Sequence, residues 1–123
     1  MALLNFQKQF AEAVKSGTKR QTIRKERKYP IKKGERLYLY AGLRTKKAKK
    51  LKEAKCRSVK KIKIFQTGPF YNIRIMPEHS PYYLCTINDD QFAKDDGFEN
   101  SQEMINWFEK THGLPFEGIL IRW

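Results

Sequence analysis

A short stretch near the start of the chain combines residue types that could do acid, base or nucleophilic chemistry. Residues 17–24 read GTKRQTIR, with an ammonium at Lys19, a hydroxyl at Thr22 and a guanidinium at Arg24. A hydroxyl can attack a carbonyl or hold a water, an amine can accept the proton, and a cation can stabilise an oxyanion. The stretch is not a phosphate-binding P-loop, because Lys19 follows Gly17 at two positions and no second glycine is present.

A carboxylate much further along the chain could complete such a site. Asp96 precedes Gly97 and Phe98, and a carboxyl group in a site that disfavours its anion can donate a proton. Lys19 could act as a base if burial and Arg24 lower its pKa, and it would otherwise be an oxyanion partner. We predict that Lys19, Thr22 and Asp96 converge on one cleft. The plainer interpretation is that the two basic residues are exposed charges and that Asp96 marks a helix end.

The elements around residues 17–24 are predicted from local pattern. Residues 5–15 have apolar side chains at helical spacing and predict a short amphipathic helix that ends at Ser16 and Gly17. Residues 21–24 alternate as a strand does. Period two then directs Thr22 and Arg24 towards a cavity, while Gln21 and Ile23 lie on the other face and Ile23 enters the core.

The remaining pattern predicts a small α+β domain. Strands are expected over 36–41, 59–65, 82–87 and 116–123, and short helices over 88–97 and from the capping-box pattern at Asn100 to Gly113. Residues 70–81 read either as a hairpin arm or as a loop flap. Five or six strands with three short helices, and no βαβ rhythm, favour a small β-barrel over a doubly wound sheet.

Several of these stretches resemble the ASCH domains, relatives of the PUA-like RNA-binding barrels. That family is marked by a G-x-K-x-x-T-x-R signature after a first helix, which residues 17–24 match. Further elements resemble the family in the same order: LYLYAGLRTK at 37–46, Asp96-Gly97-Phe98, the helix ending in Trp107-Phe108, and the final strand to Trp123. The resemblance covers nearly the whole chain, and residues 66–81 match least well.

The resemblance implies a barrel with a cleft lined by the signature residues and a role in RNA or nucleotide recognition. One branch, the small bacterial acetylcytidine amidohydrolases, removes an acyl group from the exocyclic nitrogen of cytidine, and its lysine and threonine correspond to Lys19 and Thr22. A glutamate of that branch corresponds to Asp96, whose carboxylate is one methylene shorter, and the resemblance implies that Asp96 passes a proton to the departing cytosine amine. Ribonuclease activity is another outcome in the wider family. The resemblance implies no cofactor.

The charge balance favours polyanionic partners. The chain of 123 residues contains 26 Lys and Arg against 13 Asp and Glu, a formal charge of +13, and such a field attracts nucleic acid, anionic membrane or an acidic protein. Much of this positive charge lies in residues 44–61, which contain ten basic residues and one glutamate. The candidate RNA contacts are Arg24, Arg44, Lys46, Lys47, Lys49 and Lys50. RNA binding is the leading hypothesis, with the amidohydrolase and a basic protein-interaction module as alternatives.

The composition also sets the expected context. The length predicts one domain over residues 1–123, and we expect a monomer. No apolar run approaches the roughly 18 residues that span a bilayer, and two isolated cysteines argue for reduced thiols in the cytoplasm. His79 and His112 have no partner at ligand spacing, so no metal site is expected.

Overall fold

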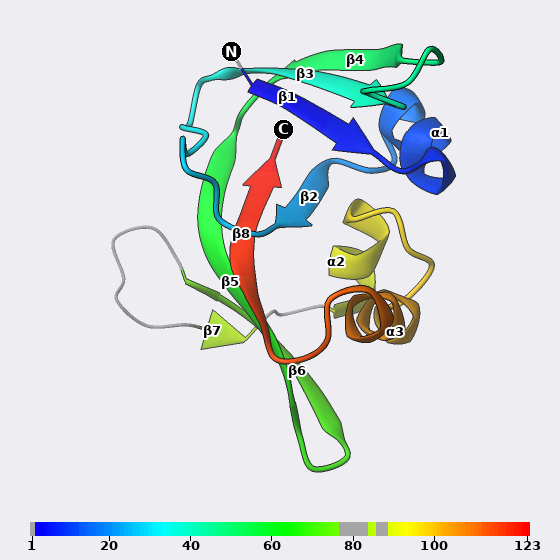
Figure 1. Cartoon of the computed structure of the whole chain (residues 1–123). Coiled ribbons are helices and arrows are strands. Elements are labelled where there is room, and N and C mark those ends of the chain that lie inside the picture. The colour runs from blue at the N-terminus through cyan, green and yellow to red at the C-terminus, as the bar shows by residue number, and fades with distance from the viewer. Residues whose placement is uncertain (1, 77–83, 86–88) are drawn as a thin grey trace.

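The structure is a computed structural model that describes residues 2–76, 84–85 and 89–123. In this part of the chain eight strands form two sheets, accompanied by three helices, so the α+β class is confirmed (Figure 1). No helix of the described residues is long and apolar enough to cross a membrane.

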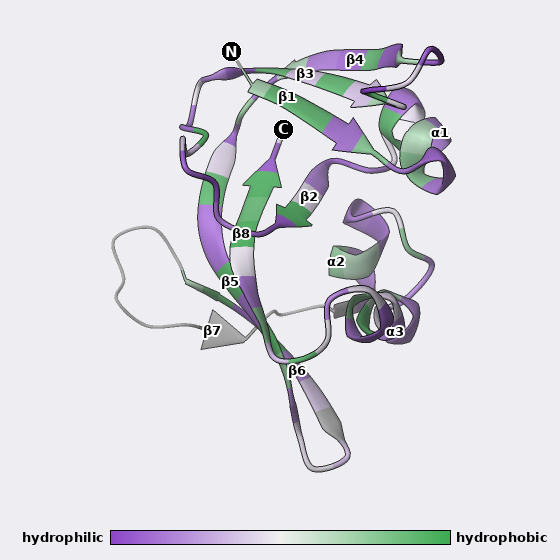
Figure 2. Ribbon diagram, in the orientation of Figure 1, coloured by the Kyte–Doolittle hydropathy of each residue, from purple (hydrophilic) through white to green (hydrophobic). Residues whose placement is uncertain are grey.

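The smaller sheet has the order β1-β3-β4, formed by Ala2–Phe6, Arg36–Ala41 and Lys49–Lys55. β1 runs parallel to β3, and β3 runs antiparallel to β4 with a bulge between Leu39 and Tyr40. Buried and exposed residues alternate along β1, so that every second side chain enters the core. β4 is an edge strand with mostly hydrophilic side chains (Figure 2), as is common where an edge must avoid pairing with other chains.

The larger sheet has the order β2-β8-β5-β6-β7 and is antiparallel throughout. Its strands are Gln21–Arg24, Phe116–Arg122, Ser58–Thr67, Phe70–Met76 and Leu84–Cys85. The mostly hydrophobic β8 lies between β2 and β5, and the β5–β6 hairpin projects from the body of the molecule (Figure 1). This sheet fixes β2, the strand that carries Thr22 and Arg24.

Three helices complete the fold. α1 (Lys8–Ser16) ends at Gly17, whose φ of 88° is accessible to glycine at little cost. α2 (Asp89–Asp95) and α3 (Ser101–Thr111) pack on each other. The capping-box pattern is confirmed in part: Asn100 Oδ1 accepts a 2.9 Å hydrogen bond from the Glu103 amide, while the Glu103 side chain accepts from the Glu99 amide rather than from Asn100.

One hydrophobic cluster joins both sheets and all three helices. Its largest fully buried members are Phe108, Leu4, Leu37, Leu39, Ile62, Ile64, Met104, Leu120, Ile121 and Val14. Ile23 is buried, as predicted. Cys56 is a free buried thiol.

Several expectations need correction. The predicted helix at 5–15 begins only at Lys8, because the preceding residues form β1 against β3, which lies about 35 positions further along the chain. Five or six strands is too low a count for the described residues. Residues 49–55 of the basic run form the edge strand β4, in which five of the seven residues are exposed and Leu51 and Ala54 are half-buried. Residues 70–76 are a hairpin arm. Residues 77–83 lie outside the described part of the chain, as does most of the strand expected at 82–87.

The described strands form two sheets rather than one continuous sheet. Among the described residues no ladder of backbone hydrogen bonds connects β1-β3-β4 with the five-stranded sheet, so no closed barrel is found. The chain passes from one sheet to the other between β4 and β5, where the Cys56 amide donates to the Glu35 carbonyl and the Arg57 amide donates to the Arg122 carbonyl.

Candidate functional site

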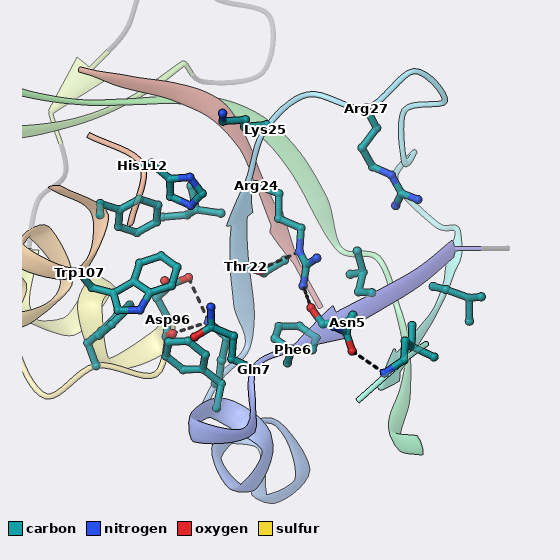
Figure 3. A pocket seen from close by; sticks show the side chains of 18 of the residues that line it. Asn5, Phe6, Gln7, Thr22, Arg24, Lys25, Arg27, Asp96, Trp107 and His112 are labelled. Atoms are coloured by element: carbon teal, nitrogen blue, oxygen red, sulfur yellow. Dashed lines mark hydrogen bonds and ion pairs between the residues drawn. The ribbon is translucent and has the colours of Figure 1, made fainter. Parts of the chain in front are cut away.

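A pocket of about 860 Å³ lies where β1, β2 and α1 meet the segment joining α2 to α3 and the end of α3 (Figure 3). All four residues predicted for the cleft line it: Lys19, Thr22, Arg24 and Asp96. Lys19, Thr22 and Asp96 are also buried, with exposed fractions of 3%, 5% and 3%. The plainer interpretation of Lys19 as an exposed charge is therefore wrong.

Lys19 and Asp96 form a buried ion pair. The ammonium nitrogen lies 3.4 Å from Asp96 Oδ1 and donates a short hydrogen bond to the Asp96 carbonyl oxygen. Lys19 Nζ also lies 5.0 Å from the ring centre of Phe10 and 5.8 Å from that of Phe6, close enough for cation–π attraction. The ammonium is thus held by one carboxyl group and two rings, away from water.

Local backbone contacts bring these two residues together from positions 77 apart in the chain. After the turn at Gly17, the Lys19 amide donates to the Ala13 carbonyl of α1, and the Arg20 amide donates to the Asp95 carbonyl at the end of α2. Gly97 has a φ of 93°, and a Cβ there would stand 3.1 Å from Lys19 Cδ and 3.2 Å from Phe10 Cδ1. A glycine after Asp96 therefore leaves the room that the lysine side chain occupies.

Burial shifts both members of the pair towards their neutral forms. The pKa of Lys19 is lowered chiefly by burial, although Asp96 opposes the shift. The pKa of Asp96 is raised from 3.8 to about 6 by burial, against the effects of Lys19, Gln21 and Arg24. Paired groups with pKa values displaced in this way are frequent in sites of proton transfer, and structural ion pairs show them as well.

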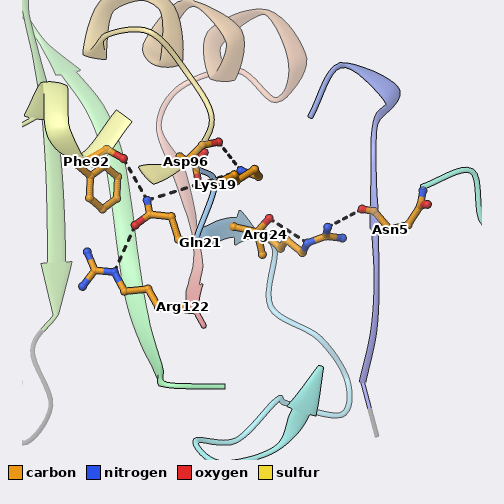
Figure 4. A network of polar contacts seen from close by, with 8 residues as sticks. Asn5, Lys19, Gln21, Arg24, Phe92, Asp96 and Arg122 are labelled. Atoms are coloured by element: carbon orange, nitrogen blue, oxygen red, sulfur yellow. Dashed lines mark hydrogen bonds and ion pairs between the residues drawn. The ribbon is translucent and has the colours of Figure 1, made fainter. Parts of the chain in front are cut away.

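Gln21 extends the pair into a polar network that sequence reasoning missed (Figure 4). Its Nε2 donates to the Phe92 carbonyl at 3.4 Å and to Asp96 Oδ1 at 3.5 Å, and its Oε1 accepts from Arg122 Nε at 3.3 Å. The alternation of β2 predicts only that Gln21 lies on the face opposite the cavity. A buried side-chain amide requires hydrogen-bond partners. A glutamine on the face of β2 that was expected to enter the core could therefore have indicated that other polar groups lie on that side of the strand.

Thr22 is held by Arg24 rather than by Lys19. Arg24 Nε donates to Thr22 Oγ1 at 3.2 Å, and Arg24 Nη2 donates to the Asn5 carbonyl of β1. The guanidinium lies 4.9 Å from the ring centre of Phe6. Its pKa falls to about 10, chiefly through burial and then through repulsion by Arg27. Since Arg24 donates to the hydroxyl oxygen, the hydroxyl proton of Thr22 remains available to another acceptor.

The predicted RNA contacts outside β2 divide into two groups. Arg44 lines the pocket, at a residue whose φ is 73°. The lysines of the basic run lie outside the pocket on the turn before β4 and on the strand itself, where all are exposed: Lys46, Lys47, Lys49 and Lys50. Lys50 pairs with Glu53 at 2.9 Å.

Aromatic side chains form one wall of the pocket. Trp107, from the apolar stripe of α3, is half-buried and lines the pocket, with its ring centre 5.8 Å from that of Phe10. The ring centre of His112 lies 5.7 Å from that of Trp107, and the pKa of His112 is lowered by burial and by Lys25. The planes of Phe10, Phe98 and His112 are inclined to that of Trp107 by 80°, 54° and 69°, so the wall consists of rings packed edge to face, and a planar ligand could stack on the face of a single ring.

No trio of His, Cys, Asp and Glu side chains in the described residues could hold a metal ion. His79 lies outside the described residues. Comparison with known proteins found no matching family model, no matching curated protein and no matching solved structure.

Proposed function

We propose that the chain is an ASCH-like domain that hydrolyses the acyl group of acetylcytidine or a related modified nucleoside. The observation that carries this proposal is the buried Lys19–Asp96 pair in the same pocket as the Thr22 hydroxyl. The PUA-like fold remains part of the proposal, supported by the order of the signature elements along the chain.

The burial of the pair supports a chemical role. Removing two opposite charges from water costs several kcal/mol per ion, and well-packed apolar residues often serve stability equally well. Here the pair lines a pocket large enough for a ligand, and the Thr22 side chain and an aromatic wall line the same pocket.

The reaction uses the neutral form of the pair, in which the proton is on Asp96 and Lys19 is an amine. Burial raises the population of this form because neither group then carries a charge, and with a pKa of about 6 Asp96 keeps its proton in a fraction of the molecules near neutral pH. Thr22 Oγ1 attacks the acyl carbon, its proton passes to the Lys19 amine, and Asp96 protonates the cytosine nitrogen as the C–N bond breaks. The resulting threonine ester is hydrolysed by water, which releases the carboxylic acid and restores the hydroxyl.

Arg24 is a positioning residue in this scheme. Its hydrogen bond to Thr22 Oγ1 orients the hydroxyl and stabilises negative charge that develops on the oxygen. Arg24 also donates a hydrogen bond to the Asn5 carbonyl, which fixes its position relative to β1. The base of the nucleoside would stack on the wall that contains Trp107.

The test is incubation of folded protein with acetylcytidine and chromatographic measurement of cytidine. Lys19→Met, Thr22→Val and Asp96→Asn should each lower the rate by about 100-fold or more, as expected for groups that act in the transition state. Lys15→Met and Thr111→Val change exposed residues of the same types outside the pocket and serve as matched controls. No cytidine above buffer from the folded wild-type protein would reject the proposal.

A second candidate function is RNA binding without catalysis, which the charge of +13 and the exposed lysines favour. Its test is titration of a fluorescent single-stranded RNA at two salt concentrations. Phosphate contacts predict an affinity that falls steeply with salt. Absent affinity at low salt, or affinity indifferent to salt, would contradict it.

A further inference from the structure

The pocket holds more positive charge than the proposed chemistry uses. Its lining includes one carboxylate, that of Asp96, and five cationic side chains: Lys19, Arg24, Lys25, Arg27 and Arg44. Lys19 is paired with Asp96, and Arg24 is hydrogen-bonded to Thr22 and Asn5. Lys25, Arg27 and Arg44 are exposed, and none forms an ion pair with another residue that the structure describes.

The charges are distributed unevenly along the pocket. The ion pair is buried at the inner end beside Phe10, whereas Arg27 belongs to the segment after β2 and Arg44 to the turn after β3. Figure 3 shows the guanidinium of Arg24 between Asp96 and Arg27, next to Asn5 of β1. The pocket therefore has an interior that contains both charges, Lys19 and Asp96, and an exposed end that carries Arg27 and Arg44. We call this exposed end the mouth.

Arg27 and Arg44 are the two guanidinium groups that line the mouth, both are exposed, and neither is paired with an acidic side chain among the residues that the structure describes. An anion bound there would gain charge-assisted contacts, and guanidinium groups match the geometry of phosphate oxygens.

The size of the pocket agrees with a ligand larger than a base. Its volume of about 860 Å³ lies near the upper end of the range for sites that bind small molecules and cofactors. A pyrimidine at the inner end, with its acyl group beside Thr22, leaves space towards the mouth for the ribose and a substituent on it.

We propose that the mouth, formed by Arg27 and Arg44, binds a phosphate group of the substrate. The substrate is then a phosphorylated acetylcytidine, either a mononucleotide or a residue of an RNA strand, rather than the free nucleoside. This inference rests on the proposed function, which places the base at the inner end.

The experiment compares three substrates for the wild-type protein: acetylcytidine, its 5′-monophosphate, and a short single-stranded RNA with one acetylcytidine. At about 50 mM salt, kcat/KM should be at least about tenfold higher for the phosphorylated substrates, and the advantage should shrink at about 200 mM salt. If the RNA exceeds the mononucleotide, the phosphate is supplied by a strand. If kcat/KM is equal for the RNA and for the 5′-monophosphate, the substrate is the mononucleotide.

A double variant tests the residues. Arg27→Gln/Arg44→Gln should reduce the ratio of kcat/KM for the nucleotide to that for the nucleoside by about tenfold, as expected when charged contacts to phosphate are removed. Lys33→Gln/Arg36→Gln removes the same charge from exposed residues that do not line the pocket, and should keep the wild-type ratio.

A binding measurement separates the two proposals. Calorimetry with cytidine and cytidine 5′-monophosphate reports on the mouth without requiring turnover. Hydrolysis of all substrates at equal kcat/KM, with equal binding of the two ligands, overturns the phosphate site and leaves the hydrolase. Salt-sensitive, Arg27- and Arg44-dependent binding of the monophosphate without hydrolysis supports the phosphate site and overturns the hydrolase.

Discussion

Lys19 and Asp96 lie in surroundings where a single charge would be much less stable than a pair. Asp96→Leu alone would leave an ammonium among Phe6 and Phe10, which should lower the free energy of unfolding by about 3–5 kcal/mol. Adding Lys19→Met removes that ammonium, so the double variant should recover most of the loss. Urea unfolding of the wild type, both single variants and the double variant measures this coupling.

Activity is the second measurement on these four proteins. The double variant should remain folded and yet form no cytidine from acetylcytidine, which separates the chemistry from stability. If the double variant loses as much stability as the two single variants together, the two groups do not interact.

The raised pKa of Asp96 predicts how stability depends on pH. Its pKa is about 6 in the folded protein against an ordinary 3.8, so between these values the folded state holds a proton that the unfolded state has released. Stability therefore decreases as pH rises from about 4 to about 6, by about 3 kcal/mol from this residue. The loss is complete above about pH 6.

Asp96→Asn provides the reference for this prediction, because it cannot titrate. The difference in unfolding free energy between wild type and Asp96→Asn, measured in urea from about pH 4 to about pH 7, should move against the wild type as pH rises to about 6. A difference that does not change over this interval would mean that the buried carboxyl group has an ordinary pKa.

At the scale of elements, the site depends on the close approach of β2 and β8. A Cβ at Gly118 of β8 would overlap the carbonyl oxygen of Arg24. Gly118→Ala should therefore displace β2, costing about 1–3 kcal/mol of stability, and should also weaken hydrolysis because Thr22 and Arg24 move with the strand. Thermal unfolding and kcat/KM for acetylcytidine measure the two effects.

Gly113→Ala is the control for this substitution. Gly113 has a φ of 78°, and a Cβ at this position would meet no other atom within 4 Å. This change should cost about 1 kcal/mol through backbone strain alone and leave kcat/KM unchanged. Equal effects of the two variants on kcat/KM would indicate that strand spacing does not control the site.

At the scale of the whole molecule, affinity for RNA should depend on where the positive charges lie and not only on the net charge. Replacing Lys46, Lys47, Lys49 and Lys50 by Gln should lower affinity for single-stranded RNA about tenfold at low salt and flatten its dependence on salt, by about 0.7 in logarithmic slope for each lost phosphate contact. The measurement is fluorescence anisotropy at several salt concentrations. A control with Gln at Lys8, Lys15, Lys32 and Lys33 has the same net charge, and equal losses in both would mean that binding follows net charge only.

Local elements of the site were predictable because their causes are local. A glycine ends α1 and an alternating tetrad follows it, so both the turn at Gly17 and β2 could be placed from a few residues. Period two also placed Thr22 and Arg24 on one face of that strand, whereas the expectation that Lys19 lines the same cleft came from the resemblance of residues 17–24 to a family signature. The cap at Asn100 is likewise a matter of four consecutive residues.

Other features depend on partners far along the chain. The local pattern extends the first helix back to Asn5, whereas parallel pairing with β3 makes the residues before it a strand. Composition could not show that Arg44 lines the pocket while the lysines at 46–50 do not, because the turn after β3 is what places Arg44 at the pocket. The role of Gln21 required knowledge of what lies behind β2.

The residues alone determined the kinds of chemical group available: an ammonium, a hydroxyl and a guanidinium close together after a helix end, a distant carboxylate, and a large excess of positive charge. Only the tertiary structure decided that Asp96 meets Lys19 in a buried pocket, that Arg24 holds Thr22, and that three arginines line the pocket. The physical reason is burial. A side chain's pKa and partners depend on which distant segments exclude water from it, and local spacing carries no information about those segments.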